Sequence, residues 1–275
     1  MARLKQGVFS WEDVLTQRYQ SNKPNALRPR RRTLTGHQQE QQEQQEQPDS
    51  STQEECRLLA RLSPELRLII WEYVLGGRRL HIVQRPHRRL GYIICSEDGS
   101  CDVCLGVVKK ASHGDQLLSL PMTCRQIYTE CIHMIYALNR FEFNNTWSLT
   151  YLRPTIPAER WESIRAVELS WAFPGHWLPS KDPVKSVYFS AGRAQWVETC
   201  QALTRMKGLQ AFTLSLSVNW FCEPVEKIPV FLEPLRDLNL KKGWAVHLPE
   251  QPYYLHEMAS IGSVLRSRGI DCVLL

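Results

Sequence analysis

Apolar residues recur at helical spacing in two segments of the first half of the chain. The first segment covers residues 64–75, where Ser63 can cap the free amide N–H groups and Pro64 suits the first helical turn. Two glycines, beginning with Gly76, end this helix. The second segment, residues 123–139, opens with a threonine and a glutamine at capping-box spacing. The pattern therefore predicts two amphipathic helices in this region.

Strand-like segments follow the first helix and recur to the end of the chain. Residues 79–83 and 90–95 are rich in Ile, Val and Tyr and flank a Pro-His-Arg-Arg turn, which predicts a β-hairpin. Further strands are expected at 141–143, 166–170, 211–218, 244–248 and 272–275, and further helices at 191–207, 230–239 and 253–267. Strands that alternate with helices favour parallel pairing. The predicted fold class is α/β with an α+β front: a helical region with a hairpin insert, then a layered, mostly parallel strand-helix sheet.

The composition along the chain predicts three parts. Residues 37–47 read HQQEQQEQQEQ and offer no aliphatic or aromatic side chain to offset the entropy of ordering. We therefore expect residues 1–55 to form a disordered tail and linker. Residues 56–140 are expected to form the helical front with its hairpin, and residues 141–275 an irregular, leucine-rich-like strand-helix region.

The first helix carries two apolar arcs when it is drawn as a wheel. One arc is expected to face the core of the domain. The second arc is separated from the first by charged residues, so that one core cannot easily bury both. Either the hairpin at residues 79–95 covers the second arc, or another protein docks on it. The first arc consists of Leu66, Ile69, Ile70, Tyr73 and Val74, and the second of Leu68, Trp71 and Leu75.

Three sequence motifs carry a resemblance to a known family. Residues 62–74 read LSPELRLIIWEYV and resemble the opening helix of an F-box, and residues 117–128, LLSLPMTCRQIY, resemble the later F-box helices. Together with IYALNRFEF at residues 135–143, they are similar to a fungal family of F-box-like domains of unknown function. An F-box is compact, whereas residues 76–116 separate the two pieces in this chain.

The resemblance implies a function in protein recruitment. An F-box binds a Skp-type adaptor of a cullin ubiquitin ligase, and the region behind it recruits a protein substrate. The predicted partner-binding residues are Leu68, Trp71 and Leu75 of the second arc, together with Pro64 at the start of the helix. The alternative is a scaffold protein that does not bind the adaptor.

A pair of cysteines, Cys101 and Cys104, is the strongest metal-binding candidate. A C-x-x-C turn can point both thiolates at one tetrahedral zinc ion. Cys95 and His113 complete the predicted ligand set, and His81 and another histidine in the same polar insert are further possible ligands. A second C-x-x-C is absent from the sequence, so the pattern favours reduced thiols in a surface loop over zinc, and no cofactor is expected.

The net charge of +6 invites comparison with nucleic-acid-binding proteins. Eight basic residues in 1–36 are offset by six acidic residues in 37–55, and no stacking platform of interleaved aromatic residues appears. The sequence therefore argues against DNA binding, which stays a weaker alternative together with zinc binding.

The remaining patterns predict a non-catalytic intracellular protein. The motifs of nucleotide-binding loops, serine hydrolases and zinc proteases are absent from the sequence. No apolar run reaches the length of a membrane span, and no export signal opens the chain. The nine cysteines are therefore expected to stay reduced in a cytoplasmic or nuclear environment.

Overall fold

The structure is a computed structural model that describes residues 56–85, 89–96, 101, 103–104, 117–144, 148–173, 183–218, 225–241, 243–250 and 252–275. The expectations for residues 1–55 lie outside this part of the chain. Within the described part, no helix has both the length and the apolar character that crossing a membrane requires.

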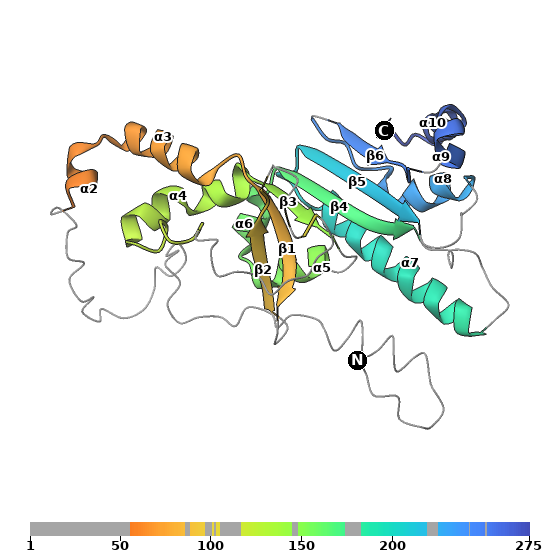
Figure 1. Cartoon of the computed structure of the whole chain (residues 1–275), viewed down its shortest axis with the longest axis horizontal. Helices are drawn as coiled ribbons and strands as arrows, with labels where there is room; N and C mark the ends of the chain where they lie inside the picture. The colour runs from red at the N-terminus through yellow and green to blue at the C-terminus, as the bar shows by residue number, and fades with distance from the viewer. Residues whose placement is uncertain are drawn as a thin grey trace, which may run out of the picture.

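Helices and short 3-10 turns alternate with strands along the described chain (Figure 1). In chain order they are α2 (Arg57–Arg61), α3 (Pro64–Leu75), β1 (Arg79–Arg85), β2 (Arg89–Ile94), α4 (Arg125–Ala137), β3 (Arg140–Phe143), α5 (Ser148–Leu152), η3 (Arg153–Thr155), α6 (Ala158–Ser163), β4 (Ala166–Phe173), α7 (Pro183–Thr204), β5 (Ala211–Val218), α8 (Lys227–Leu232), η5 (Glu233–Leu235), β6 (Trp244–His247), α9 (Pro252–His256), α10 (Met258–Ser267) and β7 (Val273–Leu274).

The strands form one seven-stranded sheet in the order β2-β1-β3-β4-β5-β6-β7. Only β1 and β2 pair antiparallel; every other neighbouring pair is parallel, which confirms the predicted α/β class. The predicted hairpin exists, and its strand β1 also pairs with β3. One sheet therefore continues across the boundary that the sequence placed near residue 140.

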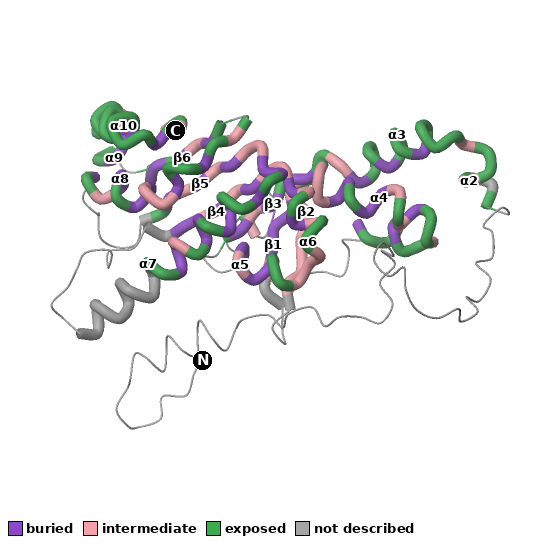
Figure 2. Tube along the Cα trace, turned by 180° about the vertical axis from the view of Figure 1, so that it is seen from behind, coloured by how far each residue is buried: buried purple, intermediate pink, exposed green. Residues whose placement is uncertain are grey.

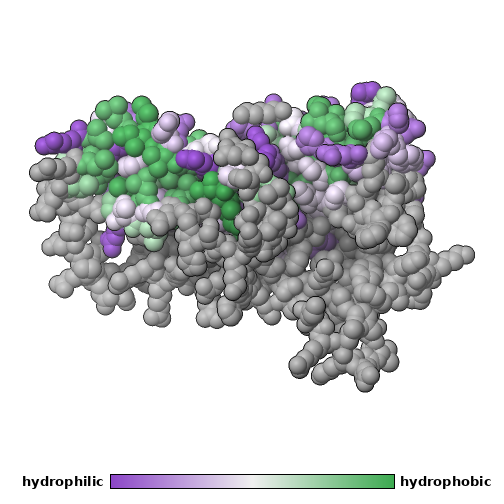
Figure 3. Space-filling model, in the orientation of Figure 1, coloured by the Kyte–Doolittle hydropathy of each residue, from purple (hydrophilic) through white to green (hydrophobic). Residues whose placement is uncertain are grey.

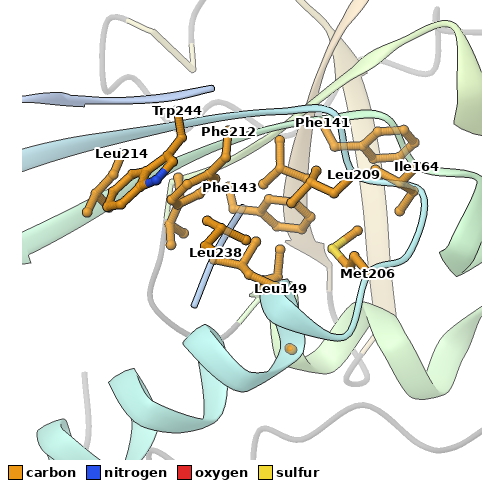
Figure 4. Close-up of a cluster of buried hydrophobic side chains, with 14 of the residues drawn as sticks. Phe141, Phe143, Leu149, Ile164, Met206, Leu209, Phe212, Leu214, Leu238 and Trp244 are labelled. Atoms are coloured by element: carbon orange, nitrogen blue, oxygen red, sulfur yellow. The ribbon is translucent and has the colours of Figure 1, made fainter. Parts of the chain in front are cut away.

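The two faces of the sheet differ sharply in composition. On β4, Val167, Leu169 and Trp171 are buried, while the residues between them are polar and only partly buried. The same alternation runs along β5, where Phe212 and Leu214 point to the buried face. Figure 4 shows Phe212 and Leu214 with buried neighbours from another strand and from the helical layer, such as Phe143 and Leu149. Alternation of this kind means that the helices cover one face and leave the other polar.

Helix α7 is anchored to the sheet by an aromatic cluster. Trp196 is fully buried, lies 4.6 Å from the ring of Trp171 on β4 and stacks on Phe231 of α8 at 4.2 Å. Its indole N–H donates to the Phe231 carbonyl at 2.6 Å, so that its polar atom is satisfied inside the core. The helix predicted at residues 191–207 lies largely within α7, and its apolar residues Trp196, Cys200 and Leu203 are all buried.

Helices α3 and α4 extend side by side from one end of the sheet, at the left of Figure 1. Each one leads into a strand, α3 into β1 and α4 into β3, and these strands are parallel neighbours. The predicted N-cap of α3 is confirmed, since the Ser63 hydroxyl accepts from the Leu66 amide. Helix α4 begins differently: the Cys124 thiol caps it by accepting from Ile127, in place of the predicted threonine.

Candidate functional site

Helix α3 buries the opposite side from the one predicted. Trp71 and Leu75, which were predicted to bind a partner, are only 2% and 1% exposed and lie in the chain's own core. Pro64 and Leu68 remain on the surface, Leu68 at the border of the buried side with 39% exposure. Two of the four predicted partner-binding residues are therefore core residues, and the prediction that a partner covers them is wrong.

A buried ion pair explains why this side of α3 faces inward. The guanidinium of Arg67 donates to the Glu130 carboxylate of α4 from Nε at 3.2 Å and from Nη2 at 2.7 Å. The Trp71 indole, one turn along α3, donates to the same carboxylate at 3.0 Å. The two donors stand four residues apart on one helix face, so a single acceptor on α4 orients both. The hydrogen bonds of Arg67 and Trp71 to Glu130 therefore determine which side of α3 is buried, although the other side carries more apolar residues.

The first arc of α3, predicted to lie in the core, is exposed. Ile69 is 62% exposed and Tyr73 is 88% exposed, and the three other members of the arc also lie on the surface. Helix α3 is accordingly mostly green in Figure 2, and Figure 3 shows hydrophobic atoms gathered over this end of the molecule. We call this surface the α3 face; it consists of Leu66, Ile69, Ile70, Tyr73 and Val74.

A second site lies beside the hairpin, where His81, Cys95, Cys101 and Cys104 converge. Their ligand atoms all lie within 4.8 Å of one another. The Sγ atoms of Cys95 and Cys104 are 3.6 Å apart, and the Cys104 Sγ lies 3.4 Å from the Nε2 of His81. We call these four residues the Cys/His cluster.

The elements of the hairpin position the Cys/His cluster. His81 lies on β1 and is fully buried, and Cys95 directly follows β2, held by its amide N–H to the Arg79 carbonyl at 2.8 Å. Cys101 and Cys104 come from the turn in the insert that follows. Three of the four predicted ligands are thus brought together, while His113 lies outside the described residues. The fourth position is taken by His81, which the sequence placed among the further possible ligands.

The three thiols differ in their readiness to ionise. Burial raises the pKa of Cys101, but the amide N–H groups of Cys104 and Val103 and the nearby His81 outweigh it and lower the pKa to about 7. Burial and the neighbouring Cys95 raise the pKa of Cys104 to about 12. One thiolate therefore forms near neutral pH, whereas the close packing of thiols opposes ionisation of the others.

The imidazole of His81 lies next to a buried carboxylate on its Nδ1 side. Its Nδ1 lies 3.2 Å from Oε2 of Glu142, the residue opposite it on β3. Burial lowers the pKa of His81, but Glu142 and Cys101 outweigh it, so the pKa is raised. Among the described residues neither His81 Nδ1 nor Glu142 Oε2 has a hydrogen bond of good geometry. The two atoms are thus buried and close, and a proton on Nδ1 would join them.

A pocket of about 860 Å³ opens beside the cluster at the end of the sheet where the parallel strands begin. Cys95 and Cys104 line it together with several arginines. Arg79 and Arg140 both pair with Glu168, at 3.2 Å and 2.8 Å. Glu168, together with Glu142 at 3.6 Å from Arg79, therefore offsets part of the positive charge of this wall.

A protein-family model described as a domain of unknown function, DUF7730, matches residues 51–268. The chain belongs to this family. Comparison with curated proteins and with solved structures gave no match. The DUF7730 match includes α3, the Cys/His cluster and all of the sheet except β7.

Sequence reasoning missed three polar residues of the DUF7730 domain that matter for these sites. Glu130 and Glu142 each stand on an element predicted from its apolar residues, and Asn139 follows the end of α4. Each of them contacts a residue far away in the chain. For Glu130 and Glu142, the available signal was a charged residue next to a position expected to be buried, because an ion in a core needs a partner.

Proposed function

We propose that this DUF7730 chain is a non-catalytic protein-interaction module that docks a partner on the α3 face. The observation that carries the proposal is the spacing of the exposed apolar residues. Leu66, Ile69 and Tyr73 stand at positions i, i+3 and i+7, the stripe that a helix normally buries. Continuous apolar surface of this kind is a common mark of a protein interface.

The partner that we propose is a Skp-type adaptor of a cullin ubiquitin ligase. The resemblance of residues 62–74 to the opening helix of an F-box supports this class of partner. The contact between α3 and α4 supports it further, because the first F-box-like motif forms α3 and the second leads into the start of α4. The sheet behind them would then recruit the protein substrate. Docking would use the apolar side of a helix as a recognition surface.

The test is binding of the full chain to a purified Skp-type adaptor, measured by calorimetry and size-exclusion chromatography. Wild-type chain is expected to form a one-to-one complex. Combined Ile69→Glu and Tyr73→Glu should abolish the complex, because two charges would be buried without partners. Both side chains are exposed, and glutamate is a good helix former, so the fold should survive.

The matched control is Val264→Glu, which places a glutamate on an exposed apolar position of α10. This variant should bind the adaptor like the wild type, and circular dichroism should show equal helix content in all three proteins. Two results would overturn the proposal: a wild-type chain that does not bind the adaptor, or a double variant that binds as tightly as the wild type. A homodimer that blocks the α3 face would count against it equally.

A further inference from the structure

We propose that His81, Cys95, Cys101 and Cys104 bind one Zn²⁺ ion in a tetrahedral Cys₃His site. The proposal stands apart from the α3 face and from any partner. Thiolate sulfur and imidazole nitrogen are the donors that zinc prefers in closed structural sites. The site would fasten the turn at residues 101–104 to the sheet next to its edge strand.

The interatomic distances fit such a site. A tetrahedral zinc ion with bonds of about 2.3 Å to sulfur and about 2.0 Å to nitrogen places two sulfurs about 3.8 Å apart and a sulfur and a nitrogen about 3.5 Å apart. The observed separations are 3.6 Å between Cys95 and Cys104 and 3.4 Å between Cys104 and His81. The protein fold alone thus holds these edges of the ligand set at the lengths that zinc requires.

The turn from Cys101 to Cys104 supplies its two sulfurs in a way that suits a metal. The backbone amide groups of Val103 and Cys104 face the Cys101 sulfur. Donation from the backbone to a ligating sulfur steadies its charge and its direction. The C-x-x-C spacing therefore acts together with the local backbone.

Residues that contact the four ligands also favour a bound metal ion. Metal at Nε2 of His81 requires the proton to be on Nδ1, which faces Glu142 Oε2 at 3.2 Å. The pair that lacks a good hydrogen bond among the described residues would then have one, as in carboxylate–histidine–zinc arrangements. Three thiolates and one Zn²⁺ leave a net charge of −1. Arg79 lines the same pocket wall as Cys95 and Cys104, and its guanidinium also pairs with Glu168 at 3.2 Å and with Glu142 at 3.6 Å.

Two other uses of the cluster explain less of it. A cysteine nucleophile beside His81 and Glu142 needs one thiol, whereas three converge here. A disulfide between Cys95 and Cys104 would leave Cys101 and the buried imidazole without a role. Four protein ligands leave no open coordination position, so the ion would serve structure rather than catalysis. Binding converts the protonated thiols to thiolates and releases their protons to solvent.

The first experiment uses the wild-type full chain purified with a reducing agent. Elemental analysis should find one zinc per chain, and X-ray absorption at the zinc edge should show three sulfurs at about 2.3 Å and one nitrogen at about 2.0 Å. Replacement by Co²⁺ should produce the intense visible bands of a tetrahedral ion and a thiolate-to-cobalt charge-transfer band. These readouts need no variant, so a misfolded mutant cannot obscure the answer.

The second experiment compares variants with a matched control. Cys104→Ser and His81→Asn should lose the stoichiometric zinc, while Cys56→Ser, which removes an exposed thiol at the start of α2, should keep it. Glu142→Gln, which leaves all four ligands in place, should weaken zinc binding about 10- to 100-fold in a chelator competition.

The proposal fails if the reduced wild-type chain contains no zinc and takes up none when Zn²⁺ is added. It also fails if the cobalt form is octahedral, or if Cys104→Ser retains zinc as firmly as Cys56→Ser. A chain that yields a Cys95–Cys104 disulfide without binding metal after reduction would assign the cluster to redox chemistry instead.

Discussion

Arg67 of α3 and Glu130 of α4 form a two-bonded ion pair, with Nε to Oε2 at 3.2 Å and Nη2 to Oε1 at 2.7 Å. The remaining Arg67 nitrogen donates to the carbonyls of Leu59 and Leu62 at 3.1 Å and 2.7 Å. One guanidinium therefore joins three segments: the end of α2, the start of α3 and the middle of α4. This contact sets the orientation of α3, and with it the surface that a partner can reach.

Glu130→Gln should destabilise the helical front. The amide keeps the volume of the carboxylate but leaves the guanidinium of Arg67 and the Trp71 indole with a weaker acceptor. We expect the thermal midpoint to fall by roughly 4 to 8 °C. Gln126→Ala is the control, since it removes only a surface hydrogen bond to the same carboxylate. An unchanged midpoint for Glu130→Gln would contradict the role of the pair.

The same carboxylate predicts how stability depends on pH. The guanidinium of Arg67, together with the Trp71 indole, outweighs burial and lowers the pKa of Glu130 to about 2. In the unfolded chain, a glutamate titrates near its ordinary value of about 4.3. The stabilisation is thus complete above about pH 4.3 and is lost as the pH falls toward 2. Denaturant unfolding curves of the wild type and Glu130→Gln should converge over this range, and a gap that widens in acid would refute the assignment.

The side chain of Asn139 should stabilise the packing of α3 on α4. Its amide donates to the carbonyls of Leu75 and Ile135 at 2.7 Å and 2.9 Å, and its oxygen accepts from the Arg78 amide at 2.7 Å. Asn139→Ala should cost about 1 to 3 kcal/mol of unfolding free energy, because these groups would lose their partner in a buried place. Asn139→Asp tests the direction of these hydrogen bonds. Aspartate can still accept from the Arg78 amide but cannot donate to the two carbonyls, so this variant should destabilise the protein as well.

Truncation of a side chain should destabilise the protein strongly on the buried side of α3 and very little on the exposed side. Trp71→Ala is expected to cost about 3 to 5 kcal/mol, since the side chain is 2% exposed. Tyr73→Ala, two residues away and 88% exposed, should change the unfolding free energy by less than about 0.5 kcal/mol. Equal effects in chemical denaturation would mean that the burial of α3 has been assigned to the wrong side.

Two glycines offer a matched pair of substitutions. A Cβ at Gly208 would meet the carbonyl oxygen of Glu162 at 1.8 Å and the Arg165 guanidinium at 2.1 Å, so Gly208→Ala should destabilise by about 1 to 3 kcal/mol. At Gly262 in α10, the nearest atom is a Leu274 methyl at 3.7 Å. Gly262→Ala should stabilise by up to about 1 kcal/mol, because alanine favours the helix. Thermal melts of both variants check the contrast in sign.

Much of the secondary structure follows from local rules, and the sequence predicted it. Ser63 and Pro64 define the start of α3 and the glycines after Leu75 define its end. The β-rich runs at residues 166–170 and 211–218 predicted the strands β4 and β5, and residues 191–207 predicted a helix where α7 occurs. The 230–239 prediction was less accurate, because α8 begins at Lys227 and then tightens into the 3-10 turn η5. The ends of elements that depend on tertiary packing were therefore predicted less accurately than the elements themselves.

The sequence alone determined the α/β class, the alternation of elements and the presence of a C-x-x-C turn, because these depend on residues close together in the chain. Tertiary structure decided which side of α3 is buried and which histidine joins the three cysteines. Arg67 and Glu130 are 63 positions apart, and His81 and Cys104 are 23 apart. A helical wheel counts apolar residues and cannot include an ion pair supplied by another helix. Contacts of that range exist only once the chain has folded, and they outweigh the local pattern.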